Sequence, residues 1–486
     1  MDDMLYVLHQ NGFRGKIWRL TKALNKGLTA RVKTKAGLSR VIMRETGGKQ
    51  GGKLMVPMFA KTMDTLAEDM QEDQSLGILI RNHQIATLLF MDDAMTFAEG
   101  PEQQQRSLNA VSEFGEKHQI EWGESKCNVM EVGSSRTTTK EWKLGDKTIK
   151  SCETYKYLGV QICRNGKNDE NLEFRMKKAK AAVRAINSKG KNGIMKKIEM
   201  EYILRLHEAV IVPTLLYDAE TWPLNVTALT KIDKFEIWAW KSMIGLPKTT
   251  PTAAVMFSCG ALYPSIRIKA KQLLYLHKVL QKDRDHWALV TLLDVQEKDI
   301  GWAKQIKEII ESWGLEENWE VIKTKTYNSW KREVEQAAEK KNKEKIQEDC
   351  MNKKRGEITQ KTKTKSILPL LESSEYARKP ETFMKEDNKL IARAYIMGRY
   401  GMLQCAANYS MGYATKMCAE CGVTDDENHR INHCKLWLNT NLFSSCDKLN
   451  FEDIYSDDRS KSLKVIERIL LMWDLGNGRN IMRGGS

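Results

Sequence analysis

The segment His83–Glu99 constrains the fold of this chain most strongly. Two short apolar runs, 85–90 and 94–98, flank the pair Asp92-Asp93, a pattern that predicts a β-hairpin with two carboxylates at its turn. Neighbouring carboxylates raise each other's pKa when they are buried, and a divalent cation removes that repulsion. Mg²⁺ binds one or two carboxylates together with substrate phosphates, so the hairpin suits metal-assisted nucleotidyl transfer. A solvated turn is the alternative, because Asp is also a favoured turn residue.

The composition indicates a globular protein that binds polyanions. The 486 residues are 41% hydrophobic and 29% charged, which leaves room for roughly two to four domains with a sizeable core. The net charge of +15 favours nucleic acid as a partner, with binding that weakens as the salt concentration rises. A simple contribution to solubility is the alternative.

The sequence further predicts an intracellular protein of the nucleus or the cytoplasm, without a membrane partner. No apolar run reaches the roughly 18 residues that span a bilayer. The acidic first residues also lack the basic start and apolar middle of a signal peptide. In a reducing compartment the ten cysteines would be thiols or metal ligands rather than disulfides.

Several short motifs follow one another in an order typical of one enzyme family. Phe90-Met91-Asp92-Asp93 resembles the Phe/Tyr-x-Asp-Asp hairpin of reverse transcriptases, and its surroundings resemble the enzymes of non-LTR retrotransposons. Further segments similar to that family are Asn11–Gly15, Arg31–Thr34, Lys49–Phe59, Gly123–Gly133, Tyr157–Gly159 and Tyr217–Trp222. Their shared order is more specific than any one of them.

The resemblance implies an RNA-directed DNA polymerase, a nucleotidyltransferase that uses Mg²⁺ or Mn²⁺. Its partners would be an RNA template, a DNA primer and deoxynucleoside triphosphates. Asp92 and Asp93 would be the catalytic residues and the magnesium ligands. The other implied roles are template and nucleotide binding by Gln50 and Gly51, triphosphate binding by Lys126, and a primer grip of Tyr157, Leu158 and Gly159. The alternative for Gln50 and Gly51 is an exposed glycine linker, and the alternative for Lys126 is an ordinary surface lysine.

The chain also departs from the family's pattern. The family has a further aspartate on a strand upstream of the position of Asn11, and the chain starts too close to Asn11 to supply that strand. Met91 stands where the family usually has Ala, and Met55-Val56 stands in place of Ser-Pro. The sequence therefore resembles the C-terminal portion of a reverse transcriptase, truncated before one metal ligand and inactive by itself.

The predicted fold class is α+β. Apolar periodicity predicts helices over 3–30 (with a break at Asn11-Gly12), from 56, and over 103–118, together with strands in 29–46, near 129 and within 142–162. Antiparallel strands backed by two helices would form a partial polymerase palm. The predicted domains are a palm at 1–164, a helical thumb at 165–300, a basic helical linker at 301–375 and a C-terminal region with a zinc knuckle at 376–486.

The predicted thumb combines an apolar stripe with a basic face. The stripe is typical of core packing and consists of Leu172, Met176, Ala179, Val183 and Ile186. The basic face suits contact with a primer–template backbone and consists of Arg175, Lys177, Lys178, Lys180 and Arg184. Trp222, Trp238 and Trp240 are expected in the core, with stacking on nucleic acid as the alternative. The basic segment 340–365 predicts a mobile helix or linker.

A second candidate site has the spacing Cys418-x2-Cys421-x7-His429-x4-Cys434. Four such ligands form the tetrahedral environment of structural Zn²⁺, and His433 competes with His429 as the third ligand. The spacing that uses His429 resembles the knuckle found C-terminal to the polymerase in non-LTR retrotransposons. A knuckle of this kind is structural and contacts RNA.

Three hypotheses follow for the function. The first is a reverse transcriptase of the non-LTR type that lacks activity alone. The second is a non-catalytic RNA-binding remnant that acts through the basic thumb, the linker and the zinc knuckle. The third is a degenerate element without a selected role. No endonuclease signature is found in either half of the sequence.

Overall fold

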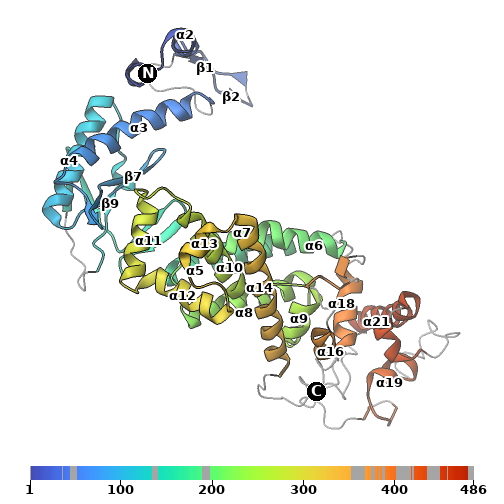
Figure 1. Cartoon of the computed structure of the whole chain (residues 1–486). Helices are drawn as coiled ribbons and strands as arrows, with labels where there is room; N and C mark the ends of the chain where they lie inside the picture. The colour runs from blue at the N-terminus through green and yellow to red at the C-terminus, as the bar shows by residue number, and fades with distance from the viewer. Residues whose placement is uncertain are drawn as a thin grey trace. The chain divides into compact units, whose positions relative to one another are not determined.

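The computed structural model divides the chain into two compact units, and Figure 1 labels many of their helices and several of their strands. Unit 1 contains Met1–Asn168 and Lys282–Ala303, and unit 2 contains Asp169–Gln281 and Lys304–Ser486. The residues that the structure describes are 2–35, 37–43, 52–133, 141–188, 198–351, 367–373, 378–381, 384–385, 389–400, 417–418, 421–434, 449–456 and 458–479. Helices and short strands coexist in them, as the α+β prediction requires.

Unit 1 begins with two helices and four two-residue strands. They are α1 (Asp2–Gln10), α2 (Gly15–Asn25), β1 (Thr29–Ala30), β2 (Lys33–Thr34), β3 (Gly37–Leu38) and β4 (Ile42–Met43). The predicted helix break is confirmed, because Gly12 adopts a φ of +86° that favours glycine. The predicted strand pairing is confirmed as well, with β1 antiparallel to β4 and β2 antiparallel to β3. Leu5 and Leu8 of α1 pack against Met58, which lies in the third helix of the chain.

The main core of unit 1 lies against two long helices, α3 (Met55–Glu72) and α4 (Pro101–His118). The predicted apolar face of α4 is buried in this core at Leu108, Val111 and Phe114. Leu66 of α3 and Trp142, which lies on the strand Glu141–Leu144, belong to the same cluster. Both predicted helices are therefore confirmed; α3 lies against residues 87–90 of the predicted aspartate hairpin, and α4 lies against residues 141–144.

The strands form several small sheets rather than one antiparallel palm sheet. They are β5 (Ile78–Ile80), β6 (His83–Ile85), β7 (Thr87–Phe90), β8 (Asp93–Thr96), β9 (Asn128–Val129), β10 (Glu141–Leu144), β11 (Lys147–Ser151), β12 (Thr154–Tyr157) and β13 (Val160–Cys163). Among the described residues β5–β6, β7–β8 and β12–β13 are separate antiparallel hairpins, while β11 pairs antiparallel with β10 and parallel with β9. The expectation of one antiparallel sheet is thus corrected. In each of these three hairpins a two-residue turn joins the strands, so each short strand forms its backbone hydrogen bonds with its neighbour in sequence.

A segment from far along the sequence belongs to unit 1. Helix α11 (Trp287–Glu297) lies against β5 and β6. Arg81 Nη2 lies 2.7 Å from Glu297 Oε2, and His83 Nε2 lies 3.3 Å from Asp285 Oδ1. Exposed contacts of this kind contribute little free energy, but they show that residues 285–297 lie against the β5–β6 hairpin.

The described part of unit 2 consists mainly of helices. They are α5 (Asp169–Ser188), α6 (Met200–Leu206), the π-helix η3 (His207–Ile211), α7 (Val212–Leu215), α8 (Val226–Ile244), α9 (Thr252–Ser258), α10 (Pro264–Leu280), α12 (Gly301–Trp313), α13 (Trp319–Thr324), α14 (Tyr327–Met351), α16 (Ile367–Glu372), α18 (Lys389–Arg399), α19 (Glu427–Asn432), the 3-10 helix η5 (Phe451–Tyr455) and α21 (Arg459–Arg479). Trp222 and Trp240 lie in the core as predicted, and Trp238 is half-buried. No helix in the described ranges has both the length and the apolar character that crossing a bilayer requires.

Helix α14 lies inside the predicted linker but packs firmly in unit 2. Its buried residues recur at every fourth position: Trp330, Val334, Ala338, Asn342, Ile346 and Cys350. Each step of four advances about 40° around a helix, so the buried stripe winds around α14 and meets α10, α9 and α16. Asn342 is fully buried, accepts a hydrogen bond from the Tyr263 amide and donates one to the Ala261 carbonyl, both at 3.1 Å. The rest of the basic segment, 352–365, lies outside the described residues.

Helix α5 confirms the apolar stripe and corrects one residue of the basic face. Leu172, Ala179 and Val183 are buried as predicted. Arg175 is only 5% exposed, and its guanidinium carbon lies 4.2 Å from the centre of the Tyr217 ring. Arginine can be buried against an aromatic face because it is planar and more weakly hydrated than lysine.

Candidate functional sites

The hairpin of β7 and β8 places the aspartate pair at a two-residue turn. Phe90 pairs with Asp93, so Met91 and Asp92 form the turn between the strands. Met91 adopts a φ of +56°, a left-handed conformation that is uncommon for residues with a side chain. Asp92 and Asp93 are both exposed. The hairpin predicted from the sequence is confirmed, and its carboxylates face solvent rather than the core.

The base of this hairpin is anchored in the core of unit 1. Ile85 and Ala86 are buried, and the Phe97 amide donates a hydrogen bond of 3.0 Å to the Ala86 carbonyl. Gly77 lies so close to this strand that an added Cβ would come within 2.6 Å of the Ala86 Cα. The exposed turn is therefore held by a tightly packed base.

Two tyrosines of β12 lie in the electrostatic neighbourhood of Asp93. Burial raises the pKa of Tyr155, and the charges of Cys127 and then Asp93 raise it further. Burial and then the charge of Asp93 also raise the pKa of Tyr157. The Tyr155 hydroxyl donates a hydrogen bond of 2.7 Å to the carbonyl of Lys126. Asp93 thus acts electrostatically on both tyrosines, and Tyr155 is hydrogen-bonded to the backbone of Lys126.

Tyr155 was not selected from the sequence. It lies two residues before Tyr157 on the same strand, and residues at this spacing share one face of a strand. That alternation is the sequence signal that would have found it. Its hydrogen bond ties β12 to the short 3-10 helix η1 (Glu124–Lys126).

The predicted primer grip is a second two-residue turn. Tyr157 pairs with Val160, so Leu158 and Gly159 form the turn between β12 and β13. Both have positive φ, +46° and +86° respectively. A turn with two left-handed residues matches the right-handed twist of a hairpin, and Gly159 adopts it without strain. Leu158 adopts it at a free-energy cost of about 1–2 kcal/mol.

Two of the predicted nucleotide-site residues cannot be located in this arrangement, because Gln50 and Gly51 lie outside the described residues. Lys126 is exposed at the end of η1. Among the described residues, one group alone brings three or more Cys, His or carboxylate ligand atoms within 4.8 Å of one another, and it does not include Asp92 or Asp93. The hairpin therefore offers two exposed carboxylates, a ligand set that suits Mg²⁺ when substrate phosphates supply further oxygens.

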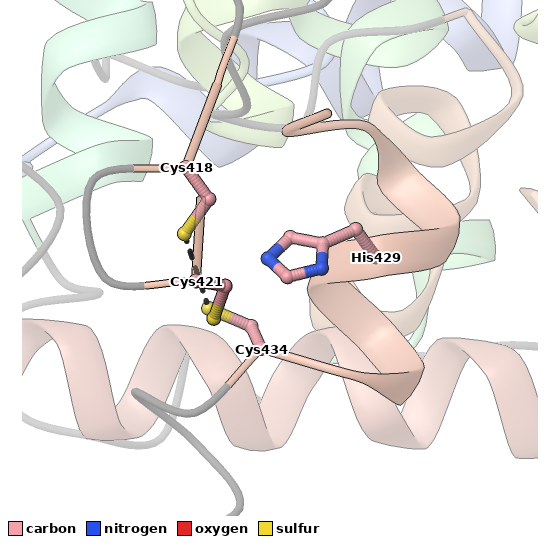
Figure 2. A group of neighbouring side chains, drawn as sticks. All are labelled: Cys418, Cys421, His429 and Cys434. Atoms are coloured by element: carbon pink, nitrogen blue, oxygen red, sulfur yellow. Dashed lines mark hydrogen bonds between the residues drawn. The ribbon is translucent and has the colours of Figure 1, made fainter. Parts of the chain in front are cut away.

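That one group consists of the four residues predicted from the Cys/His spacing, Cys418, Cys421, His429 and Cys434. The sulfur atoms of Cys418 and Cys434 lie 3.8 Å apart, and Figure 2 shows the His429 ring directed toward the three thiols. The Nε2 atom of His429 is buried and has no hydrogen-bond partner in the described part of the chain. Three thiols and one imidazole form a ligand set that fits structural Zn²⁺.

Tight backbone structure holds the first two thiols. The Cys418 amide donates a 2.7 Å hydrogen bond to the Val423 carbonyl, and the Gly422 amide donates a 2.9 Å bond to the Cys418 carbonyl. Gly422 has a φ of +67°, which glycine adopts without strain. Met417 and Thr424 form an antiparallel bridge on either side of this loop.

The start of α19 positions His429. Asp426 is the N-cap residue, and its side chain accepts a 2.7 Å hydrogen bond from the His429 amide. The preceding residue, Asp425, is 1% exposed and forms a two-pronged ion pair with Arg430. His433 lies at the C-cap and is not part of the group. The geometry thus favours His429 over His433.

The electrostatics of the group favour metal binding. Burial lowers the pKa of His429, so the neutral imidazole that binds metals is favoured. Burial also lowers the pKa of Arg430, but Asp425 and the thiols of Cys434 and Cys418 outweigh burial and raise the pKa overall. A positive charge therefore lies near two of the candidate ligands.

Unit 2 also buries a histidine outside both sites. His207 and Glu236 are almost fully buried, and His207 Nε2 lies 3.0 Å from Glu236 Oε1. The His207 ring stacks on Trp240 with 3.8 Å between ring centres. Burial lowers the pKa of His207, but the neighbouring carboxylates of Glu236 and Glu208 outweigh burial and raise it.

A comparison with known families finds a match, which lies within unit 1. Residues 5–162 match the family described as reverse transcriptase (RNA-dependent DNA polymerase). The match runs from α1 into β13 and includes the aspartate hairpin, Lys126 and the predicted primer grip. No curated protein matches the chain. Unit 2 lies beyond the matched region.

Proposed function

We propose that this chain is the palm, thumb and C-terminal region of a reverse transcriptase of the non-LTR retrotransposon type. The single observation that carries the proposal is the placement of Asp92 and Asp93. They lie at the turn of a two-stranded hairpin, within the family match and beside Tyr155 and Tyr157.

The residues of unit 1 have distinct roles in this proposal. Asp92 and Asp93 hold the divalent cation, and the turn at Leu158 supports the primer end. Lys126 neutralises the triphosphate, while Gln50 and Gly51 contact the template and the incoming nucleotide. When bound, Mg²⁺ or Mn²⁺ would lower the pKa of the primer 3′-hydroxyl and stabilise the leaving pyrophosphate.

We further propose that the chain does not extend a primer by itself. The described residues place two carboxylates at the hairpin and no third ligand next to them. Two metal ions that clamp the attacking and leaving oxygens need more carboxylate oxygens than this pair supplies.

The test is metal-dependent primer extension on poly-rA/oligo-dT with Mg²⁺ or Mn²⁺, compared with Asp92→Ala/Asp93→Ala. We expect no extension, together with salt-sensitive binding of the template–primer by both proteins. Extension that disappears in the double variant would establish polymerase activity and refute the proposed inactivity. A chain that neither extends nor binds the template–primer would refute the whole assignment.

The second candidate function is RNA binding without catalysis. It is favoured by the exposed cations of α5, which are Lys177, Lys178, Lys180 and Arg184, together with the Cys/His group as a zinc knuckle. RNA binding that survives Asp92→Ala but falls in Cys418→Ser would support this function. RNA binding that is equal in wild type and Cys418→Ser would exclude a contribution from the knuckle.

A further inference from the structure

A long segment near the start of the chain contains no acidic residue. Between Met4 and Arg44 the sequence has ten Lys and Arg and no Asp or Glu. The whole chain has 63 acidic residues in 486, so a segment of 41 residues would carry about five. The described part of this segment that follows α1 is called here the basic lobe, residues 14–43, and it contains α2 and β1 to β4.

The cations of the basic lobe are all exposed to solvent. Nine of them are described: Arg14, Lys16, Arg19, Lys22, Lys26, Arg31, Lys33, Lys35 and Arg40. No ion pair among the described residues involves any of the nine. Elsewhere in unit 1 the cations Lys61, Arg81 and Lys147 do pair with carboxylates, at 2.7–3.2 Å.

The basic lobe contributes little to the core of unit 1. Thr21 is the one residue in the described part of 14–43 that is buried. Nine cations that have no carboxylate partner among the described residues repel one another, which opposes the compact state. A bound polyanion relieves that repulsion and releases its own counterions, and both effects favour binding.

The distribution of the cations distinguishes between possible polyanions. Helix α2 exposes an apolar face of Ile17, Leu20 and Leu24, and an amphipathic basic helix of this kind also suits an anionic membrane surface. Four of the nine cations, however, lie on or between the strands that follow α2, in 31–40. Cations spread over a helix and two strand pairs fit a phosphodiester backbone that passes across several elements.

We propose that the basic lobe, whose residues differ from those of the aspartate hairpin and of helix α5, binds the phosphodiester backbone of RNA. The inference rests on the proposed function only in the choice of RNA as the polyanion. The contact is to phosphates and is independent of base sequence.

The test measures RNA affinity of the full chain at several salt concentrations, by anisotropy of a labelled single-stranded RNA. The variant is Lys16→Gln/Lys26→Gln/Lys33→Gln. Each lost phosphate contact lowers the slope of log K against log salt by about 0.7. We expect the slope to fall by about 2 and the affinity near 0.15 M salt to fall roughly 50-fold.

The matched control is Lys61→Gln/Lys147→Gln/Lys298→Gln. These three lysines carry the same total charge, belong to the same unit, and are ion-paired with Glu68, Glu121 and Asp294. We expect the control to keep the wild-type slope. Circular dichroism melting of both variants checks that the fold is retained.

The other outcomes overturn the inference in different ways. Wild-type RNA binding with equal slopes in the two triple variants would refute the basic lobe as an RNA surface and leave the proposed function standing. Absence of RNA binding by the wild type would refute both. If the lobe variant loses binding to phosphatidylserine vesicles but keeps RNA binding, the lobe is a membrane surface instead.

Discussion

The aspartate hairpin and the Cys/His group hold potential metal ligands in opposite ways. The hairpin exposes Asp92 and Asp93 at a turn, and the described residues add no third ligand. The Cys/His group draws four ligands from a short stretch, and three of them are buried. The difference shows that ligands close in sequence are assembled by local turns and caps, whereas a polymerase site depends on substrate and on distant strands.

The largest expected effect is at the Cys/His group. His429→Gln removes one of four ligands, and we expect zinc affinity to fall by more than 100-fold, because a structural site needs all four. Competition with a chromophoric chelator measures the affinity. His433→Gln is the matched control and should bind zinc as wild type does. Equal losses in the two variants would contradict the choice of His429.

The next test concerns the buried pair of His207 and Glu236, in which a carboxylate rather than a metal ion would contact the imidazole. His207→Gln breaks the pair with Glu236, and removing one partner of a buried pair costs about 3–5 kcal/mol in the free energy of unfolding. The raised pKa of His207 means that its contribution is complete below the unfolded value of about 6.5 and is lost as the pH rises through the folded value.

Urea unfolding at a series of pH values measures both effects. The wild type should lose stability as the pH rises above about 6.5, and His207→Gln should be less stable with a flatter pH profile. Identical pH profiles would mean that the histidine is neutral in the folded protein.

A smaller effect on zinc affinity is expected at Arg430, whose positive charge lies near two ligands of the Cys/His group. Arg430→Gln removes the positive charge near Cys418 and Cys434, and outer-shell changes of this kind weaken metal binding by about 10- to 100-fold. Arg430→Lys keeps the charge but not the two-pronged contact with Asp425, so we expect an intermediate zinc affinity. Wild-type affinity in Arg430→Gln would show that the charge has no role.

The smallest effect is expected at the hairpin. Asp92→Asn and Asp93→Asn should change the free energy of unfolding by less than about 0.5 kcal/mol, because exposed side chains rarely contribute more. Met91→Gly should stabilise the protein by about 1 kcal/mol, since glycine adopts a positive φ without strain. Urea unfolding measures all three variants. A loss above 2 kcal/mol at either aspartate would show that the carboxylate has a partner in the folded chain.

The two sites also differ in how far the sequence predicted them. The spacing of Cys418, Cys421 and Cys434 predicted the ligand set, because turns and one short helix bring such residues together locally. The aspartate hairpin was predicted for a similar reason, from alternation and its polar turn. The neighbourhood of Asp93, Tyr155 and Lys126 arises from separate hairpins, and no local pattern encodes that packing.

Packing also explains the fold-level errors. Helical periodicity placed Arg175 on the exposed face, but the ring of Tyr217 allows a guanidinium to be buried there. The high charge of 340–365 suggested a mobile helix or linker, yet one buried residue in every four is enough to pack α14, which contains residues 340–351, against α10. The prediction of a single palm sheet differs from the separate small sheets of the structure, because pairing between hairpins depends on tertiary contacts.

The return of Lys282–Ala303 to unit 1 has a consequence for the order of folding. During synthesis, residues 1–168 leave the ribosome before α11 exists, and the ion pair between Arg81 and Glu297 must wait for the intervening chain. At about 5–20 residues per second, that delay is on the order of ten seconds. The β5–β6 hairpin is therefore exposed to chaperones and proteases in a nascent chain, and a fragment that ends before residue 282 would keep it in that state permanently.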